Sequence, residues 1–240
     1  MCPHPVRDGF SCLDENFVDT DEYEGAPVVL KSFRSDVAAQ RIEYLKVVYE
    51  AMKNANVPNV DSLVHCGKYY VLLSPVGAGG VPFCRFPTDE QTVLEAIESI
   101  LEALVILHSV GWMHRDIRWP NVIKQANQSK WFLIDFDHAA TSPQDNSKDE
   151  RLSSEEHAPD MFGGSGVHTT AVDIWGIGHL MRSCDCELDP DLIDYCRALY
   201  HSNPSKRPTA DKALHWIQEY RSHTHHDPSD QTAGLSRLKC

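Results

Sequence analysis

The chain has 240 residues, of which 42% are hydrophobic, and it carries a formal net charge of −13. This length suits one large domain or two lobes that share a cleft, and the hydrophobic fraction allows a sizeable core. The acidic excess argues against a surface for polyanions, so we expect neither nucleic acid nor an acidic membrane as the main partner. No apolar run is long enough to span a bilayer, and the Met1–His4 start does not resemble a signal peptide. We therefore expect a soluble, intracellular protein of the cytoplasm.

Eight cysteines are scattered along the sequence, and no two of them have the Cys-x-x-Cys spacing. A zinc site could be assembled from Cys184, Cys186, Cys196 and His179. Reduced thiols are the better interpretation, because a cytosolic chain keeps its thiols reduced.

The N-terminal part of the sequence contains one strand pattern and one helix pattern. Residues 1–24 are acidic and turn-rich. Residues 27–33 form a β-branched, apolar run that predicts a strand, in which Lys31 is the single charge. Residues 36–56 have apolar side chains at steps of three and four residues, which predicts a helix with Asp36 as its N-cap.

A second strand and a long helix follow. Residues 69–73 predict a buried strand, which the segment Ser74–Gly77 interrupts. Gly77–Gly80 lacks the Lys-Ser/Thr pair of a phosphate loop, so a flexible linker is the better interpretation. Residues 88–108 predict the clearest helix of the chain, with Thr88 as its N-cap.

A polar stretch after this helix contains the groups that phosphoryl transfer needs. His114–Asn121 places a carboxylate, Asp116, five residues before an amide, Asn121. A second carboxylate, Asp135, follows the buried strand predicted for residues 131–134. In phosphoryl transfer one carboxylate orients the attacking hydroxyl, while an amide oxygen and another carboxylate hold the magnesium ions that bridge the phosphates.

These residues resemble the signature motifs of the protein kinases. His114–Asn121 matches H-R-D-x-x-x-x-N at every fixed position, and Asp135-Phe136 matches the start of D-F-G. Three distal segments resemble further kinase motifs in the same order: His157–Asp160 the A-P-E motif, Asp173–Gly178 the D-x-W-S-x-G helix, and Asn203–Ala210 the R-P-T turn. Aminoglycoside and choline kinases share the first loop but lack a peptide-positioning segment, so the distal motifs favour the protein-kinase branch.

Residues 25–220 are thus similar to the eukaryotic-type protein kinases, and Leu133–Ala139 is similar to the divergent fungal-type members. The resemblance implies an α+β fold of two lobes, with a reduced, mainly β N-lobe and a mainly α-helical C-lobe. The polar C-terminal end has no periodicity and predicts disorder. The expected segments are residues 1–24 as an acidic segment or a degenerate start of the N-lobe, 25–221 as the kinase domain with its N-lobe at 25–76 and its C-lobe at 77–221, and 222–240 as a disordered tail.

The resemblance implies roles for five residues. Asp116 would orient the attacking hydroxyl or accept its proton, and Arg118 would neutralise charge at the γ-phosphate. Lys31 would hold the α- and β-phosphates of ATP, while Asn121 and Asp135 would bind two Mg²⁺ ions.

The resemblance also implies contacts around the nucleotide. The helix after Lys31 should supply a glutamate that pairs with this lysine. Glu50 suits the family spacing, whereas Glu43 lies too close to Lys31. The backbone groups of Ser74 and Val76 should bind the adenine edge.

Two departures from the family pattern concern the nucleotide site. No G-x-G-x-x-G precedes the first predicted strand, although the family covers the phosphates with such a loop. Asp137 stands where D-F-G has its glycine. A residue with a Cβ restricts the backbone turning of this segment, because a positive φ becomes costly.

We therefore expect an ATP-dependent protein kinase that acts on a protein substrate, with Ser or Thr favoured over Tyr as the acceptor. The alternative is a pseudokinase, a nucleotide- or protein-binding scaffold with little turnover. Asp173 should accept hydrogen bonds from the backbone of the catalytic loop, and Asp160 should pair with Arg207. Arg115 could bind a phosphorylated loop serine. The sequence predicts no particular oligomeric state.

Overall fold

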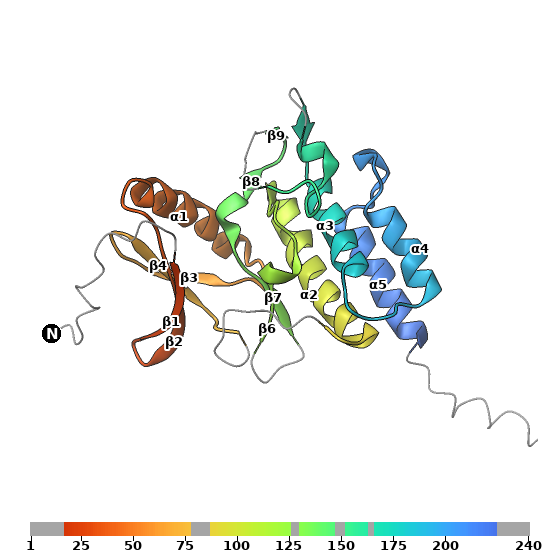
Figure 1. The fold of residues 1–240 in the computed structure, drawn as a ribbon, viewed down its shortest axis with the longest axis horizontal. Helices are drawn as coiled ribbons and strands as arrows, with labels where there is room; N and C mark the ends of the chain where they lie inside the picture. The colour runs from red at the N-terminus through yellow and green to blue at the C-terminus, as the bar shows by residue number, and fades with distance from the viewer. Residues whose placement is uncertain (1–16, 78–86, 126–129, 147–151, 163–165, 225–240) are drawn as a thin grey trace, which may run out of the picture.

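The computed structural model of this chain describes residues 17–77, 87–125, 130–146, 152–162 and 166–224. It has two parts, a mainly β lobe on the N-terminal side and a mainly helical lobe that follows it (Figure 1). The predicted α+β fold with two lobes is therefore confirmed. None of the helices in the described ranges is long and apolar enough to cross a membrane.

The first lobe is built on a four-stranded antiparallel sheet with the order β1-β2-β4-β3. The strands are β1 (Phe17–Tyr23), β2 (Ala26–Ser32), β3 (Ser62–Cys66) and β4 (Tyr70–Ser74). β1 pairs with β2 along its whole length, from Phe17 opposite Ser32 to Tyr23 opposite Ala26. The acidic segment expected at the N-terminus thus begins the first lobe from Phe17 onward, and residues 1–16 lie outside the described residues.

Helix α1 (Ala38–Ala55) packs on this sheet. Its buried residues recur at steps of three and four, as the pattern predicts, and they are Ala38, Ile42, Leu45, Val48, Tyr49 and Met52. The helix begins after Val37 without a side-chain cap, so the prediction of Asp36 as the N-cap was wrong. The Asp36 carboxylate instead pairs with Arg34 on the surface, at 2.7 Å.

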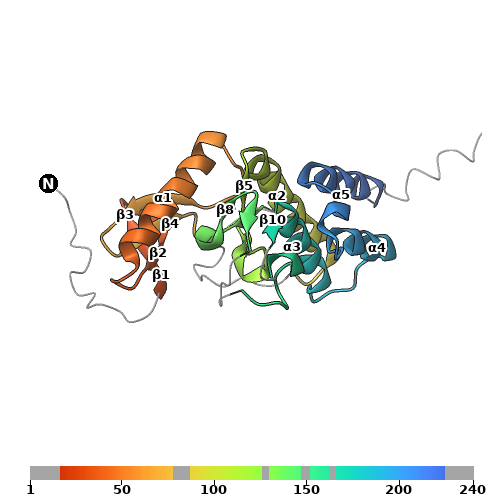
Figure 2. The same ribbon diagram turned by 90° about the horizontal axis from the view of Figure 1, so that it is seen from above.

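Four long helices form the core of the second lobe, within the described ranges, and α2 lies between the first lobe and the other three (Figure 2). They are α2 (Glu90–Ser109), α3 (Ala171–Arg182), α4 (Pro190–Leu199) and α5 (Ala210–Thr224). Asp89 caps α2 by accepting a hydrogen bond from the Thr92 N–H at 2.8 Å, because Asp89 has the extended backbone that a cap requires. The prediction of Thr88 was one residue early. Since α5 runs to Thr224, the predicted tail begins as helix, and residues 225–240 lie outside the described residues.

Short antiparallel strand pairs hold the polar loops of the second lobe. The pairs are β5 (Trp112–Met113) with β8 (Ala140–Thr141), β6 (Val122–Lys124) with β7 (Trp131–Leu133), and β9 (Gln144–Asp145) with β10 (Val167–His168). β7 also contacts the first lobe, because Leu133 donates its N–H to the Asn59 carbonyl at 2.9 Å and accepts from the Asp61 N–H at 3.1 Å. The strand that leads to Asp135 therefore lies at the junction of the lobes.

A buried ion pair joins two distal motif segments, as predicted. Arg207 Nη2 lies 2.6 Å from Asp160 Oδ1, and the Arg207 side chain is fully buried. The same guanidinium donates to the carbonyls of His201 at 2.8 Å and Ala171 at 2.9 Å. Arg207→Met should lower the free energy of unfolding by about 3–5 kcal/mol, because it leaves a carboxylate and two carbonyls without their donors. Urea denaturation measures this change.

Arg197→Met is the matched control for that substitution. Arg197 pairs with Asp194 on the surface, where the two side chains are 66% and 71% exposed. Water and salt screen such a pair, so its loss should change the free energy of unfolding by less than about 1 kcal/mol. Equal losses in the two variants would show that burial does not determine the importance of the Arg207 pair.

Candidate active site

The loop that contains the catalytic motif runs between β5 and β6 and ends in the one-turn 3-10 helix Trp119–Asn121. Trp119, to which the sequence assigned no role, is buried. Its indole N–H donates to the Leu180 carbonyl at 3.1 Å, and its ring meets Trp131 edge-on. This side chain therefore fastens the loop to the core of the second lobe.

Asp173 in the first turn of α3 fixes the backbone of the loop, as predicted. Its Oδ2 accepts from the His114 N–H at 2.9 Å and from the His108 ring at 2.8 Å, and its Oδ1 accepts from the Arg115 N–H at 2.7 Å. Arg115 has a φ of 71°, a left-handed conformation that costs free energy in a residue with a Cβ. Burial alone would raise the pKa of Asp173, but the hydrogen bond from His108 and the surrounding donors outweigh it and lower the pKa.

A glycine lets α3 approach the same loop closely. A Cβ added at Gly176 would lie 2.5 Å from the Cβ of Ile117, which is nearer than two carbon atoms can pack. Gly176 stands where the related motif D-x-W-S-x-G has its serine. The small residue at this position therefore sets the distance between the helix and the catalytic loop.

Asp116 lies in this loop with donors around its carboxylate. Oδ1 lies 2.9 Å from both Arg118 Nε and His157 Nε2, and Oδ2 accepts from Asn121 Nδ2 at 2.9 Å. Burial alone would raise the pKa of Asp116, but the hydrogen bond from His157 and the charge of Arg118 outweigh it and hold the pKa well below its ordinary value. Asp116 is therefore ionised near neutral pH, which suits a group that orients a hydroxyl.

His157 is a site residue that the sequence did not reveal. It is the first residue of the segment His157–Asp160, but the resemblance to A-P-E gave a role only to Asp160. Its side chain is buried, and because a carboxylate can only accept, Nε2 carries the hydrogen that Asp116 receives. Nδ1 lies 2.9 Å from the Ser153 carbonyl. His157 thus covers the carboxylate that an incoming hydroxyl would have to reach.

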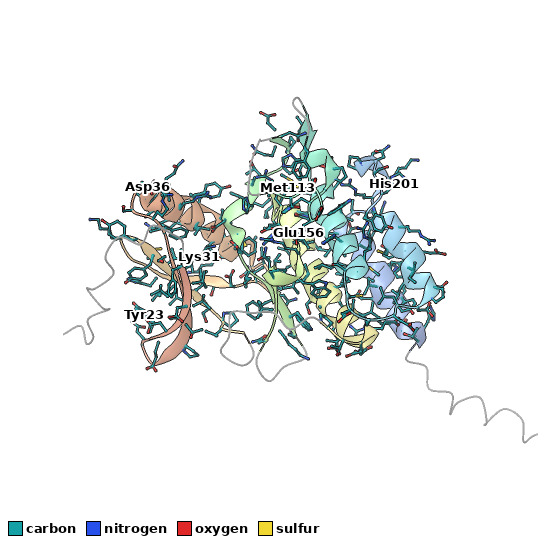
Figure 3. All side chains as sticks on the ribbon, in the orientation of Figure 1. Tyr23, Lys31, Asp36, Met113, Glu156 and His201 are labelled. Carbon is teal, nitrogen blue, oxygen red and sulfur yellow. The ribbon has the colours of Figure 1, made fainter. Side chains whose placement is uncertain are left out.

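Lys31 on β2 reaches across to the segment after β7; Figure 3 labels it on the first lobe, with Met113 and Glu156 on the second. Its Nζ lies 2.8 Å from Asp135 Oδ1 and 2.9 Å from Asp137 Oδ1. Burial alone would lower the pKa of Lys31, but the two carboxylates outweigh it and raise the pKa. Burial likewise opposes ionisation of Asp135, and the lysine more than compensates, so the pKa of Asp135 is lowered. The ammonium and the carboxylate are therefore both charged.

The structure does not bring Glu50 to Lys31, contrary to the prediction. Glu50 is exposed, whereas the preceding residue Tyr49 is on the buried face of α1. A helix turns by roughly 100° per residue, so a stripe that buries Tyr49 turns Glu50 toward solvent. Glu43, the other choice, pairs with Lys46 at 2.6 Å on the surface.

Asn121 and Asp135 offer oxygen ligands of the kind that Mg²⁺ prefers. The Ile134 N–H donates to the Asn121 carbonyl at 3.0 Å, so the two ligands lie on neighbouring stretches of backbone. Asn121 uses its amide nitrogen as a donor to Asp116, which leaves the amide oxygen as its ligand atom. The Asp135 side chain is 33% exposed and already holds the cation of Lys31. The residues present therefore fit a magnesium site.

Ser74 is the last residue of β4 and Val76 follows it where the chain leaves the first lobe, and both are half-buried. The Ser74 carbonyl accepts a hydrogen bond from Ser62 Oγ at 3.0 Å. Gly77 forms a β-bridge with Gln125 of the second lobe. Of the linker predicted over Gly77–Gly80, only Gly77 is among the described residues. The adenine contacts of Ser74 and Val76 stay a prediction.

The four possible zinc ligands do not converge. Cys184 Sγ and Cys186 Sγ lie 3.6 Å apart, but Cys196 donates to a backbone carbonyl and the His179 ring stacks on Trp175. In the part of the chain that the structure describes, no group of three or more His, Cys, Asp or Glu side chains could hold a metal ion.

Asp61 is a buried acid near the site that the sequence did not single out. The Tyr49 hydroxyl donates to its Oδ1 at 2.9 Å, and burial raises the pKa of Asp61 to about 7. The folded state therefore keeps the proton to a higher pH than the unfolded chain, in which an aspartate has a pKa of about 4. The free energy of unfolding should consequently fall as the pH rises from about 4 to about 7. Asp61→Asn should remove this contribution.

Urea denaturation of both proteins at several pH values between 4 and 8 measures the effect. The free energy of unfolding of Asp61→Asn minus that of the natural chain should grow with pH by up to about 4 kcal/mol. Taking the difference between the two proteins cancels the contribution of every titrating group that they have in common. Asp36→Asn, which changes an exposed acid, should give a curve parallel to that of the natural chain. A parallel curve for Asp61→Asn as well would mean that Asp61 is ionised throughout this range.

Comparison with known proteins agrees with the geometry. The family model "Protein kinase domain" matches residues 25–186. Crinkler effector protein 8 of Phytophthora infestans is 38% identical over 229 residues, which cover 92% of this chain and 37% of that protein. The maternal embryonic leucine zipper kinase of Danio rerio is 26% identical over 198 residues, covering 75% of this chain and 29% of its own length. Serine/threonine-protein kinase pim-2 of Danio rerio is 24% identical over 177 residues, covering 65% of this chain and 54% of its own length.

This chain thus spans roughly a third to a half of the length of these curated relatives. The narrower resemblance to fungal-type kinases stays a prediction. The chain belongs to the protein kinase family.

Proposed function

We propose that this chain is an ATP-dependent protein kinase that transfers the γ-phosphate to a protein hydroxyl. The supporting observation is that four motif residues from distant parts of the sequence meet at the lobe junction. Lys31 contacts Asp135 at 2.8 Å, and Asn121 contacts Asp116 at 2.9 Å. The two pairs are joined through the backbone bond between Ile134 and Asn121. Buried charges in fixed positions suit phosphoryl transfer, because its catalysis consists mainly of positioning and electrostatic stabilisation.

The nucleotide would be held from both lobes. Asn121 and Asp135 would bind Mg²⁺, which when bound bridges the phosphates and neutralises their charge. Lys31 would contact the α- and β-phosphates. The backbone of Ser74 and Val76 would bind the adenine edge at the end of β4.

The acceptor hydroxyl would be oriented by Asp116. Its oxygens already accept hydrogen bonds from His157 and Asn121 and form an ion pair with Arg118, so one of these contacts must give way when a substrate binds. Arg118 also pairs with Glu156 at 3.1 Å, next to His157. A substrate that displaces this segment would free both Arg118 and an oxygen of Asp116. Arg118 could then place its guanidinium fork against the γ-phosphate.

Serine or threonine is the proposed acceptor. Two relatives, pim-2 of Danio rerio and fnkB of Dictyostelium discoideum, carry the words serine/threonine-protein kinase in their names. The buried pair of Asp160 and Arg207 supports a protein rather than a metabolite as substrate, because it belongs to the segment that small-molecule kinases lack.

A scaffold without turnover is the second candidate. The sequence has no G-x-G-x-x-G ahead of Lys31. In addition, the Asp116 side chain is only 2% exposed. A protein that bound nucleotide or a partner without transferring phosphate would keep the same contacts.

The deciding experiment supplies the purified chain with Mg-ATP labelled in the γ-phosphate and with casein as a generic protein substrate. The kinase proposal expects label on serine and threonine, none in the presence of EDTA, and none above background from Asp116→Asn. Equal background from both proteins, together with a thermal shift by Mg-ATP, would refute the kinase and support the scaffold. Label on a small hydroxyl compound alone would indicate a small-molecule kinase.

A further inference from the structure

Helix α1 supplies no anion for Lys31. Glu50 is exposed, and Glu43 pairs with a neighbouring lysine on the surface. The buried face of α1 is apolar apart from Tyr49, whose hydroxyl donates to Asp61. A buried ammonium needs a fixed anion nearby, because the water that would solvate it is excluded.

Asp137 supplies this anion from the segment after β7. Its Oδ1 lies 2.9 Å from Lys31 Nζ, and the two side chains are similarly buried, 13% and 12% exposed. Asp135 makes the second ion pair, but it is 33% exposed and is the proposed magnesium ligand. A metal ion on Asp135 would compete with Lys31 for that carboxylate. The pair between Lys31 and Asp137 would remain.

The backbone around Asp137 is attached to α1. The Asp137 carbonyl accepts from Arg41 Nη1 at 3.5 Å, and the Tyr44 hydroxyl donates to the Ala139 carbonyl. Helix α1 is thus connected to Lys31 through the backbone and carboxylate of Asp137. Its own acidic side chains take no part in this connection.

The backbone conformation at this position does not require glycine. The left-handed residue of the segment is Asp135, with a φ of 66°, and Asp137 follows it in a one-turn 3-10 helix. The expectation that a residue with a Cβ restrains positive φ at position 137 therefore does not apply to this conformation. A glycine here would remove the carboxylate and relieve no strain.

We propose that Asp137 is a positioning residue that holds Lys31 at the phosphates. This inference rests on the proposed kinase function. Asp137 acts through Lys31 and touches neither nucleotide nor metal.

Steady-state kinetics of Asp137→Asn, with ATP and Mg²⁺ varied separately, tests the proposal. The KM for ATP should rise about tenfold, while the Mg²⁺ concentration at half-maximal rate stays unchanged. When Lys31 is already replaced by Met, adding Asp137→Asn should change nothing further, because the interaction it removes is already absent. Glu50→Gln, which changes an exposed acid of α1, should leave the KM unchanged.

Three results would overturn the proposal. A higher Mg²⁺ requirement in Asp137→Asn would make Asp137 a metal ligand. An equal rise in the KM for ATP in Glu50→Gln would mean that an acidic side chain of α1, and not Asp137, holds Lys31. If Asp137→Asn raised the KM for ATP by the same factor in the natural chain and in Lys31→Met, the two residues would act independently.

A chain without phosphate transfer would refute the proposed function and still allow a test of this pair. Urea denaturation is then measured for four proteins that form a double-mutant cycle. They are the natural chain, Lys31→Met, Asp137→Asn and the variant with both substitutions. Coupling between Lys31→Met and Asp137→Asn of about tenfold in the unfolding equilibrium constant supports the pair. Additive effects overturn it.

Discussion

Asp116→Asn should lower the rate of phosphate transfer by about 10²- to 10⁴-fold. The amide has the same size as the carboxylate but no charge, so it cannot attract the acceptor hydroxyl as strongly. In addition, its NH₂ group would face donors such as Asn121 and His157, which now point at the carboxylate. The initial rate of labelling of casein by γ-labelled ATP measures the loss.

Nucleotide binding separates a chemical effect of Asp116→Asn from a structural one. Asp116 is not among the proposed nucleotide ligands, so Mg-ATP should raise the melting temperature of the variant as it does that of the natural chain. Asp194→Asn is the matched control, since that side chain is 71% exposed, and it should transfer phosphate at the full rate. If Asp116→Asn kept more than about a tenth of the rate, transfer would not depend on this carboxylate.

The contacts that could be predicted from the sequence join residues whose motifs specify both partners. Asp173 was expected to bind the backbone of the loop, and it does. Asp160 was expected to pair with Arg207, and the distance is 2.6 Å. In each case one motif contains a buried charge and another contains its complement, so the pairing follows once both motifs are found in order.

The partner of Lys31 could not be found in this way. Spacing along the chain favoured Glu50, yet the helical pattern that buries Leu45, Tyr49 and Met52 leaves Glu50 exposed to solvent. The two criteria disagreed, and burial determined the outcome because the apolar stripe must face the sheet. Helical phase is therefore a better guide to such a pair than distance in sequence.

The contacts of Asp137 and His157 were not predicted from the sequence for a different reason. Each contacts a residue far away in the sequence, Lys31 and Asp116 respectively. Comparison with the family pattern shows Asp137 only as the replacement of a glycine. It gives His157, the residue before Ala158-Pro159-Asp160, no role. A substitution inside a motif can introduce a new interaction, and only the three-dimensional arrangement shows which one.

Asp173→Asn should lower the free energy of unfolding by about 3–5 kcal/mol and also disturb the catalytic loop. The carboxylate accepts from the backbone of His114 and Arg115 and from the His108 ring, and its side chain is fully buried. An asparagine amide would direct its NH₂ group at one of these donors. The left-handed backbone of Arg115 would then lose its support, and the loop with Asp116 would shift. A shift of about 1 Å can lower the rate of transfer by about 10²-fold.

Urea denaturation against pH shows whether the charge of Asp173 is responsible. The pKa of Asp173 is lowered in the folded state, so its contribution is present above a pH of about 4 and is lost as the pH falls through the lower folded pKa. The difference in the free energy of unfolding between the natural chain and Asp173→Asn should therefore be largest near neutral pH and shrink in acid. Asp36→Asn, which breaks a surface pair, should stay within about 1 kcal/mol of the natural chain at every pH. A loss in Asp173→Asn that did not change with pH would mean that shape, and not charge, holds the catalytic loop.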